Sequence, residues 1–205
     1  MMNKAHQDIK ITGGQEKRKK SVARDWIESL VIAFLLAMVV RIFIAEPFKI
    51  PTGSMRTTLL EGDIILVNKF FYGAKIPFTK LRLPAIRKPN RGDVVVFVYP
   101  EDPKKNFIKR LVAVGGEIVE IKNGTVYVND KPLIEAPFNQ RYYYNRGEFA
   151  QENQKIVVPQ DSFFVLGDNS SSSKDSRYWG FVPMKDVLGI AMIIYWPPQR
   201  VRIIK

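Results

Sequence analysis

Ser54 and Lys109 are the two side chains of this 205-residue chain whose types best suit hydrolytic chemistry. Ser54 follows Pro51 and Gly53, which favour an irregular backbone turn. A serine hydroxyl presented by such a turn is a candidate nucleophile. An ordinary Gly-Ser turn explains the same pattern, so Ser54 becomes a candidate only if a base lies close to it.

The chain lacks most of the side chains that usually act as catalytic bases or metal ligands. The chain contains no cysteine and one histidine, His6, which lies in a polar N-terminal segment. Disulfides, thiolate zinc sites, cysteine nucleophiles and metal sites built from several histidines are therefore excluded. A Ser-His-Asp triad would have to recruit His6 from a tail without apolar periodicity. A hydrolase of this composition needs another base, and we expect no cofactor.

Lys109 is the candidate for that base. In the run Asn106–Val114, the alternation of a β-strand places Lys109 on one face with the apolar Phe107, Leu111 and Ala113. Burial disfavours an ammonium and lowers a lysine pKa from about 10.4 by up to roughly 3–5 units, so a buried Lys109 can accept a proton near neutral pH. A lysine whose amine reaches solvent is the plain structural alternative.

A third polar segment, residues 166–180, is rich in Gly, Ser, Asp and Asn and follows an apolar β run. A flexible Gly/Ser linker is one explanation of this composition. Against it, Asp175 and Arg177 are spaced so that they could pair and fix the loop, and a loop hydroxyl could orient a neutral lysine.

An apolar helix precedes these residues in the chain. As a helix, residues 26–45 span roughly 30 Å, about the hydrocarbon thickness of a bilayer. A core helix would show a polar face, but residues 30–40 are apolar on every side. A cleaved signal peptide needs small residues before its cleavage point, where this chain has Phe43. We therefore predict an uncleaved transmembrane anchor over residues 25–46, ended by Pro47.

The net charge of +12 is concentrated in front of this anchor. Residues 1–24 hold seven basic side chains against two acidic ones. By the positive-inside rule, this tail stays in the cytoplasm and residues 47–205 form an extracytoplasmic domain. The densest part of the basic charge is thus explained without nucleic acid.

Residues 47–205 are predicted to be mostly β structure. Apolar runs rich in β-branched residues recur between turn signals, and no helical periodicity of any length follows the anchor. The pair Asn123-Gly124 suits a type I′ hairpin turn. The runs are 63–69, 93–99, 107–114, 117–122, 125–128, 155–158, 163–166 and 187–196. The predicted fold class is therefore mostly β, with a single N-terminal transmembrane helix.

Five stretches together resemble bacterial type I signal peptidase, the membrane-bound Ser-Lys endopeptidase that removes signal peptides from exported proteins. In the family order, they are Pro51–Met55, Gly62–Lys69, Arg91–Phe97, Lys109–Gly116 and Gly167–Arg177. The resemblance covers most of residues 26–196. It implies that the extracytoplasmic domain is catalytic. It also implies that residues 117–154 correspond to the family's variable second subdomain, in a short version.

The resemblance implies which residues act on the substrate. Ser54 corresponds to the nucleophile that forms an acyl-enzyme, and Lys109 corresponds to the general base. The backbone N–H of Ser54 and the hydroxyl of Thr52 correspond to the oxyanion-hole donors, each worth about 2.7–4 kcal/mol. Shallow apolar pockets for small residues before the cut give an Ala-X-Ala preference. The positions that correspond to these pockets are Phe48, Ile50, Pro51, Met55, Leu59 and Ile108.

The resemblance also implies supporting residues and shows departures. Ser173 corresponds to the hydroxyl that holds the lysine amine, Asp175 and Arg177 to an ion pair, and Asp168 to a supporting carboxylate. Thr57 stands where family members commonly have proline, a change expected to loosen the turn. Thr52 stands where serine is frequent and keeps the hydroxyl.

The resemblance implies signal peptides of exported preproteins as substrates, with the lipid bilayer and the export machinery as partners. It implies a single-pass protein of the plasma (inner) membrane, with no metal ion and no nucleic acid. Two alternatives remain open. A membrane-anchored binding scaffold explains the anchor and the β runs but leaves Ser54 and Lys109 arbitrary. A DNA-binding regulator with a Ser-Lys self-cleavage domain needs a helix-turn-helix module of about 60 residues, which the N-terminal segment does not offer.

Overall fold

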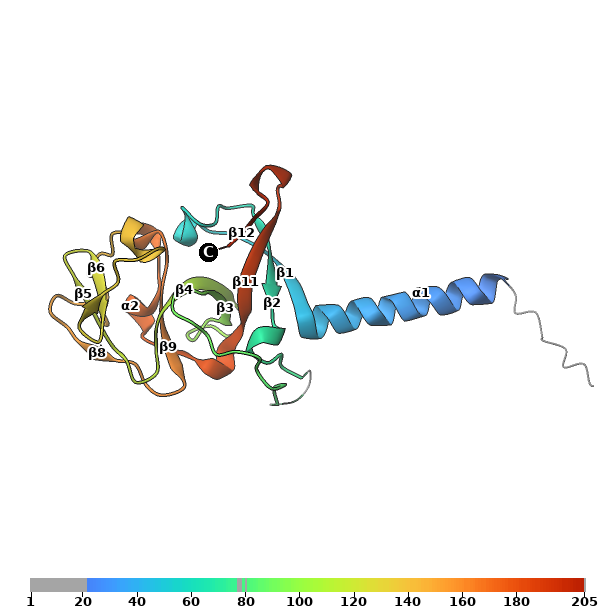
Figure 1. The fold of residues 1–205 in the computed structure, drawn as a ribbon, viewed down its shortest axis with the longest axis horizontal. Coiled ribbons are helices and arrows are strands. Elements are labelled where there is room, and N and C mark those ends of the chain that lie inside the picture. Colours follow the sequence, from blue (N-terminus) through green and yellow to red (C-terminus); the bar gives the residue numbers. More distant parts are fainter. Residues whose placement is uncertain (1–21, 77–78, 80, 205) are drawn as a thin grey trace, which may run out of the picture. The chain divides into compact units, whose positions relative to one another are not determined.

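The structure is a computed structural model that describes residues 22–76, 79 and 81–204. His6 and most of the predicted cytoplasmic tail, residues 1–24, lie outside the described residues. The chain forms two compact units, one up to Ala37 and one from Met38 onward. Every residue of the candidate site belongs to the second unit, which is shown with the first in Figure 1.

The apolar helix α1, Val22–Val39, lies in the first unit except for Met38 and Val39, and the helical conformation continues through a π-helical turn, Val40–Ile44. Residues 22–44 are long and apolar enough to cross a membrane, with a mean hydropathy of 2.5 and no buried residue. Helical structure ends at Ile44, before Pro47, because Ala45–Lys49 form strand β1 instead. β1 is an edge strand, where a proline that lacks an N–H is tolerated.

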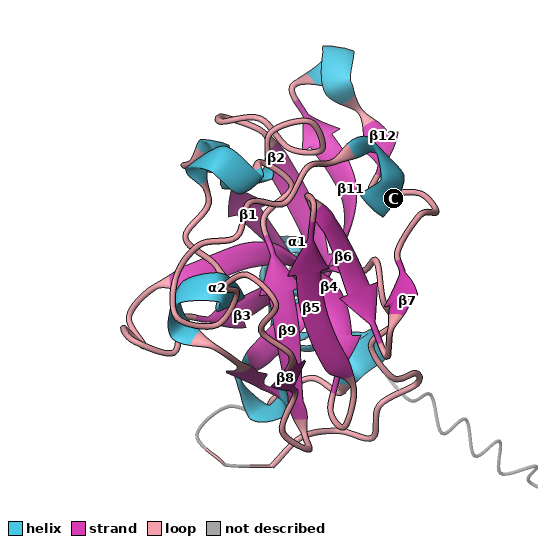
Figure 2. Ribbon diagram, turned by 90° about the vertical axis from the view of Figure 1, so that its left-hand side faces the viewer, coloured by secondary structure: helices cyan, strands magenta, loops and turns pink. Residues whose placement is uncertain are grey.

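The second unit is built mainly of β structure, which confirms the predicted fold class (Figure 2). Its main sheet has eight strands in the order β1-β2-β11-β3-β4-β9-β10, with β12 paired to β11, and every pairing is antiparallel. Besides β1, these strands are β2 (Ile64–Asn68), β3 (Val94–Val98), β4 (Asn106–Val114), β9 (Ser162–Leu166), β10 (Val182–Pro183), β11 (Val187–Trp196) and β12 (Arg202–Ile203).

A smaller antiparallel sheet of four strands, in the order β7-β6-β5-β8, packs on a core that it shares with residues of β4 and β9. Its strands are β5 (Ile118–Lys122), β6 (Thr125–Val128), β7 (Lys131–Pro132) and β8 (Ile156–Val157). Asn123 and Gly124 join β5 to β6 with φ angles of 48° and 77°, the left-handed conformation that a type I′ turn requires.

All eight predicted β runs form strands within one or two residues of their expected limits. The sequence patterns missed β1, the two-residue strands β7, β10 and β12, and the single helical turn α2 (Ser176–Trp179). β7, β10, β12 and α2 have two to four residues, too few to show a period, and Pro47 interrupts the five-residue β1. The short 3-10 turns are Gly53–Met55, Phe70–Tyr72, Phe138–Gln140, Ser170–Ser172, Met184–Asp186 and Pro198–Arg200.

Strand β4 changes partners along its length, and this change creates the site. β3 pairs with its first half, from Asn106 to Arg110, while β9 joins the opposite edge only from Arg110 onward. Within the described residues, the edge of β4 from Asn106 to Lys109 that faces away from β3 therefore has no strand beside it. The turn that carries Ser54 contacts this part of β4.

Candidate active site

Ser54 lies in the 3-10 turn Gly53–Met55, which begins after the extended residue Thr52. The side chain of Met55 is fully buried in the core below the turn. On the other side, Asn169 holds the turn through two hydrogen bonds. Its backbone N–H donates to the Ser54 carbonyl at 3.0 Å, and its side-chain amide donates to the Gly53 carbonyl at 3.0 Å. Contacts from both sides therefore fix the position of the serine.

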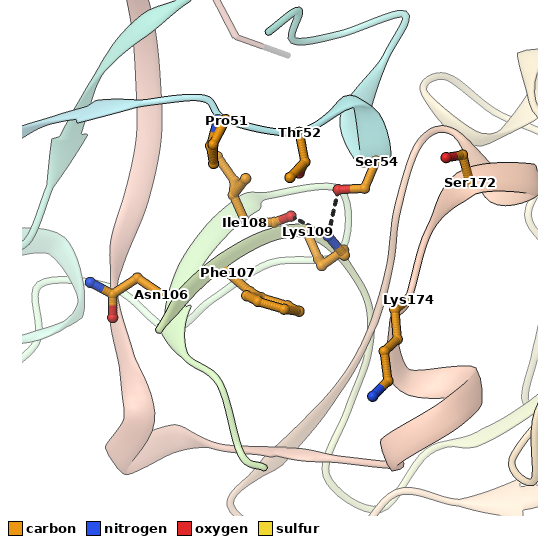
Figure 3. Close-up of a pocket in the computed structure, with 9 residues that line it drawn as sticks. All are labelled: Pro51, Thr52, Ser54, Asn106, Phe107, Ile108, Lys109, Ser172 and Lys174. Carbon is orange, nitrogen blue, oxygen red and sulfur yellow. Dashed lines mark hydrogen bonds between the residues drawn. The ribbon is translucent and has the colours of Figure 1, made fainter. Parts of the chain in front are cut away.

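Lys109 is buried, with 3% of its surface exposed, and its Nζ lies 2.6 Å from Ser54 Oγ (Figure 3). The same Nζ donates to the Ile108 carbonyl at 3.0 Å. Burial lowers the pKa of Lys109 to about 8, against the opposing effects of Asp175 and Asp168. A substantial fraction of Lys109 is thus neutral slightly above neutral pH and able to accept the proton of the Ser54 hydroxyl.

Ser173 is buried close to this pair, but Lys109 makes its hydrogen bonds to Ser54 and Ile108 instead. In the described part of the chain, the Ser173 hydroxyl has no hydrogen-bond partner. It packs against Gly167, where an added Cβ would lie 2.1 Å from Ser173 Oγ and 2.6 Å from the Ser54 carbonyl oxygen. Only glycine at position 167 allows the two serine segments to approach this closely.

Asp175 and Arg177 form the expected ion pair, and both side chains are fully buried. Arg177 Nε donates to Asp175 at 2.8 Å. The remaining guanidinium N–H groups donate to the hydroxyl and carbonyl of Ser170 and to the carbonyls of Tyr144 and Ser173. Asp175 in turn accepts the Gly167 N–H at 2.9 Å. The pair therefore fixes the loop that approaches Ser54.

Asp168 belongs to a second buried centre that sequence reasoning found only in part. Arg110 donates two hydrogen bonds to the Asp168 carboxylate, at 2.8 and 2.7 Å, and Arg141 donates a third at 3.0 Å. The Thr58 hydroxyl donates to the same carboxylate and accepts N–H bonds from both arginines. Thr58, four residues after Ser54, is thereby tied to β4 and, through Arg141, to the small subdomain, which means here residues 117–157 with strands β5–β8.

The sequence contained one usable signal for this centre. Arg110 directly follows Lys109 within one of the stretches shared with the signal peptidases, yet strand alternation assigns it to the face opposite Lys109. Arg141 lies in a polar, irregular segment with no periodicity, and Thr58 lies in a turn. No local pattern marks these two residues as partners of a carboxylate in another part of the chain.

A pocket of about 240 Å³ opens beside Ser54 and Lys109, mostly lined by apolar surface. Of the residues expected to line substrate pockets, Pro51 and Ile108 border it (Figure 3). Ile50, Met55 and Leu59 are instead buried in the core, with Phe48 and Ile108 packed against them. The pocket lining is Pro51, Thr52, Ser54, Asn106, Phe107, Ile108, Lys109, Ser172 and Lys174.

Thr52 is exposed and lines this pocket together with Ser54. Ser54 lies in the first turn of a 3-10 helix, where backbone N–H groups lack partners within the helix and can receive an anion. Thr57, where proline is common in the family, has a φ of 87°. Proline is restricted to a φ near −65°, so this turn follows a path that proline cannot adopt.

No group of three His, Asp or Glu side chains close enough to hold a metal ion occurs among the described residues. The polar groups of the pocket lining are hydroxyls, an amide and two lysines, Lys109 and Lys174.

Comparison with known proteins identifies the class to which this fold and site belong. A family model described as signal peptidase, peptidase S26, matches residues 23–196. The chain belongs to this family and is therefore a signal peptidase, with an N-terminal helix long and apolar enough to cross a membrane.

Two curated relatives agree with this assignment, and one solved structure is similar in sequence. Signal peptidase I of Pseudomonas aeruginosa is 32% identical over 91% of this chain and 78% of its own length. Signal peptidase I P of Bacillus subtilis subsp. natto is 34% identical over 92% of this chain and 97% of its own length. A crystal structure of a signal peptidase I from Enterococcus faecalis is 33% identical, with a TM-score of 0.42 over 51% of this chain and 97% of that chain.

Proposed function

We propose that this signal peptidase is a serine endopeptidase that uses Ser54 as nucleophile and Lys109 as general base. The observation that carries the proposal is the 2.6 Å contact between Ser54 Oγ and a buried Lys109 whose pKa is lowered to about 8. Neutral Lys109 accepts the Ser54 proton as Oγ attacks the scissile carbonyl, and a tetrahedral intermediate forms. The resulting ammonium gives its proton to the amine as the C–N bond breaks, and the acyl-enzyme remains.

Deacylation repeats the same chemistry with water. Lys109, neutral again after the amine leaves, accepts a proton from the water that attacks the acyl carbon. The Ser54 N–H and the Thr52 hydroxyl, both at the pocket, are the donors proposed for the oxyanion. Ser173 is buried close to the lysine and is proposed to orient its amine during turnover.

The substrate is proposed to be an extended segment of a preprotein. The edge of β4 from Asn106 to Lys109 without a neighbouring strand can pair with such a segment, as sheet edges do with extended peptides. The pocket bordered by Pro51 and Ile108 is small and apolar, which suits the small residues of an Ala-X-Ala site.

The apolar helix is proposed to anchor the protein in the plasma membrane, with the basic tail in the cytoplasm and residues 47–205 outside. Ser54 follows Ile44 by ten residues, and a chain of that length spans at most about 35 Å. The nucleophile is thus tethered near the bilayer, where signal peptides and the export machinery meet. Protease added to cells whose cell wall and any outer membrane have been removed should digest residues 47–205 but spare the basic N-terminal tail.

The dyad is tested by cleavage of a preprotein with an Ala-X-Ala site. Ser54→Ala and Lys109→Ala are each expected to lower kcat by roughly a millionfold, the loss seen when a serine protease loses its nucleophile or base. Lys131→Ala, an exposed lysine on β7, is the matched control and should cleave as the wild type does. Replacement of both alanines of the site by leucine should abolish cleavage by the wild type. Wild-type turnover by either dyad variant would disprove the assignment.

A further inference from the structure

The pocket beside Ser54 contains a second lysine that the proposed mechanism does not use. Lys174 follows Ser173 on the loop before α2, and with Ser172 it borders the pocket. Figure 3 shows these two residues on the side of the Ser54–Lys109 pair opposite Pro51 and Ile108. Besides Lys109, Lys174 is the one charged residue of the lining.

The two lysines of the pocket differ in charge. Burial lowers the pKa of Lys109, so the base is neutral when it acts. The hydrogen bond to Glu101 raises the pKa of Lys174, which therefore stays protonated wherever Lys109 is active. Among the described residues of the lining, the charge that persists at the pocket is therefore the Lys174 ammonium, which is paired with Glu101.

The present partner of Lys174 is replaceable. Its Nζ lies 2.8 Å from Glu101 on the β3–β4 hairpin, and the side chains are 58% and 50% exposed. Exposed ion pairs of this kind contribute little to stability, because water competes for both charges. Lys174 can therefore exchange the carboxylate of Glu101 for a carboxylate of the substrate at small cost. Glu101 would keep its hydrogen bond from the Tyr99 hydroxyl.

We propose that Lys174 is a specificity-determining residue that binds an acidic side chain of the substrate immediately after the cleavage point and disfavours a basic one. This inference rests on the proposed function. If Pro51 and Ile108 receive the residues before the cut, the chain after the cut leaves past Ser54 toward Ser172 and Lys174. The selected ligand is the carboxylate of an Asp or Glu among the first residues of the mature protein.

The test uses the full-length enzyme in detergent and three preproteins that differ only in the two residues after the cut, which are Glu, Gln or Lys. The wild type is expected to cleave them with kcat/KM in the order Glu, Gln, Lys, each step roughly two- to five-fold. The difference should lie in KM, because the side chain does not react and is bound equally in the ground and transition states. Added salt should reduce it.

The most decisive variants change the charge at position 174 and measure the effect on the substrate preference. Lys174→Met should abolish the preference, and Lys174→Glu combined with Glu101→Lys should reverse it while keeping an ion pair at the same place. Lys104→Met is the matched control, because it removes an exposed lysine from the same hairpin but not from the pocket, and it should keep the wild-type order.

The outcomes separate this inference from the proposed function. Cleavage of the Gln substrate by the wild type but not by Ser54→Ala supports the function whatever the charge preference. Equal cleavage of all three substrates by the wild type, or an unchanged preference in Lys174→Met, overturns the role of Lys174. Absence of cleavage by the wild type overturns both proposals.

Discussion

Two buried carboxylate–arginine centres support the candidate site, and they are built differently. Asp175 and Arg177 are two residues apart on one loop, and their guanidinium and carboxylate bonds stay mostly within that loop. Asp168 instead joins Arg110 of β4, Arg141 of the small subdomain and the Thr58 hydroxyl. The first centre gives one loop its shape, whereas the second holds three separate segments together.

This difference has a mechanistic consequence. The local pair controls the loop that carries Ser170, Ser173 and Lys174, and hence one wall of the pocket. The Asp168 centre holds the segment that follows Ser54, because Arg110 and Arg141 both donate hydrogen bonds to the Thr58 hydroxyl. We therefore expect the placement of Ser54 against Lys109 to depend on the small subdomain, which contributes Arg141.

The largest predicted effect is on stability and compares the two carboxylates. Asp168→Asn leaves two buried guanidinium groups without their counter-charge and should lower the free energy of unfolding by about 3–5 kcal/mol. Asp175→Asn should cost less, because Arg177 keeps its carbonyl and hydroxyl acceptors at Tyr144, Ser170 and Ser173. Urea denaturation of the two variants measures the order. An equal or larger loss for Asp175→Asn would contradict the distinction between the centres.

An intermediate effect is predicted for the arginine of the subdomain. Arg141→Gln removes bonds to Asp168 and Thr58 but leaves Arg110 to neutralise the carboxylate, so it should cost about 1–3 kcal/mol. The same variant should lower kcat, because Thr58 is held less firmly. Lys131→Gln, which removes an exposed cation from β7, is the control and should change stability by less than about 0.5 kcal/mol. Unaltered kcat in Arg141→Gln would show that the subdomain does not act on the nucleophile.

The parts of the site that short-range patterns describe could be predicted. The two-residue period of β4 brings Lys109 onto an apolar face, and the spacing of Asp175 and Arg177 permits an ion pair. The same period places Arg110 on the opposite face, with Val112. That face is buried because the core of the small sheet packs against it, and no local pattern reports this packing. Met55 and Leu59 lie in the core, and their assignment to substrate pockets from the family resemblance stays a prediction.

The smallest predicted effect concerns the pH dependence of acylation. The rate should rise with pH through the Lys109 pKa of about 8, since only the neutral amine accepts the Ser54 proton. Asp175 raises this pKa by stabilising the ammonium, and Asp168 does so to a smaller extent. Asp175→Asn should therefore move the midpoint of kcat/KM to lower pH by less than one unit, which corresponds to under about 1.4 kcal/mol. Asp168→Asn should move it less, so the carboxylate that matters more for stability should matter less for the base. A midpoint that rises in Asp175→Asn, or moves further in Asp168→Asn, would show that electrostatic control of Lys109 is not divided between the centres in this way.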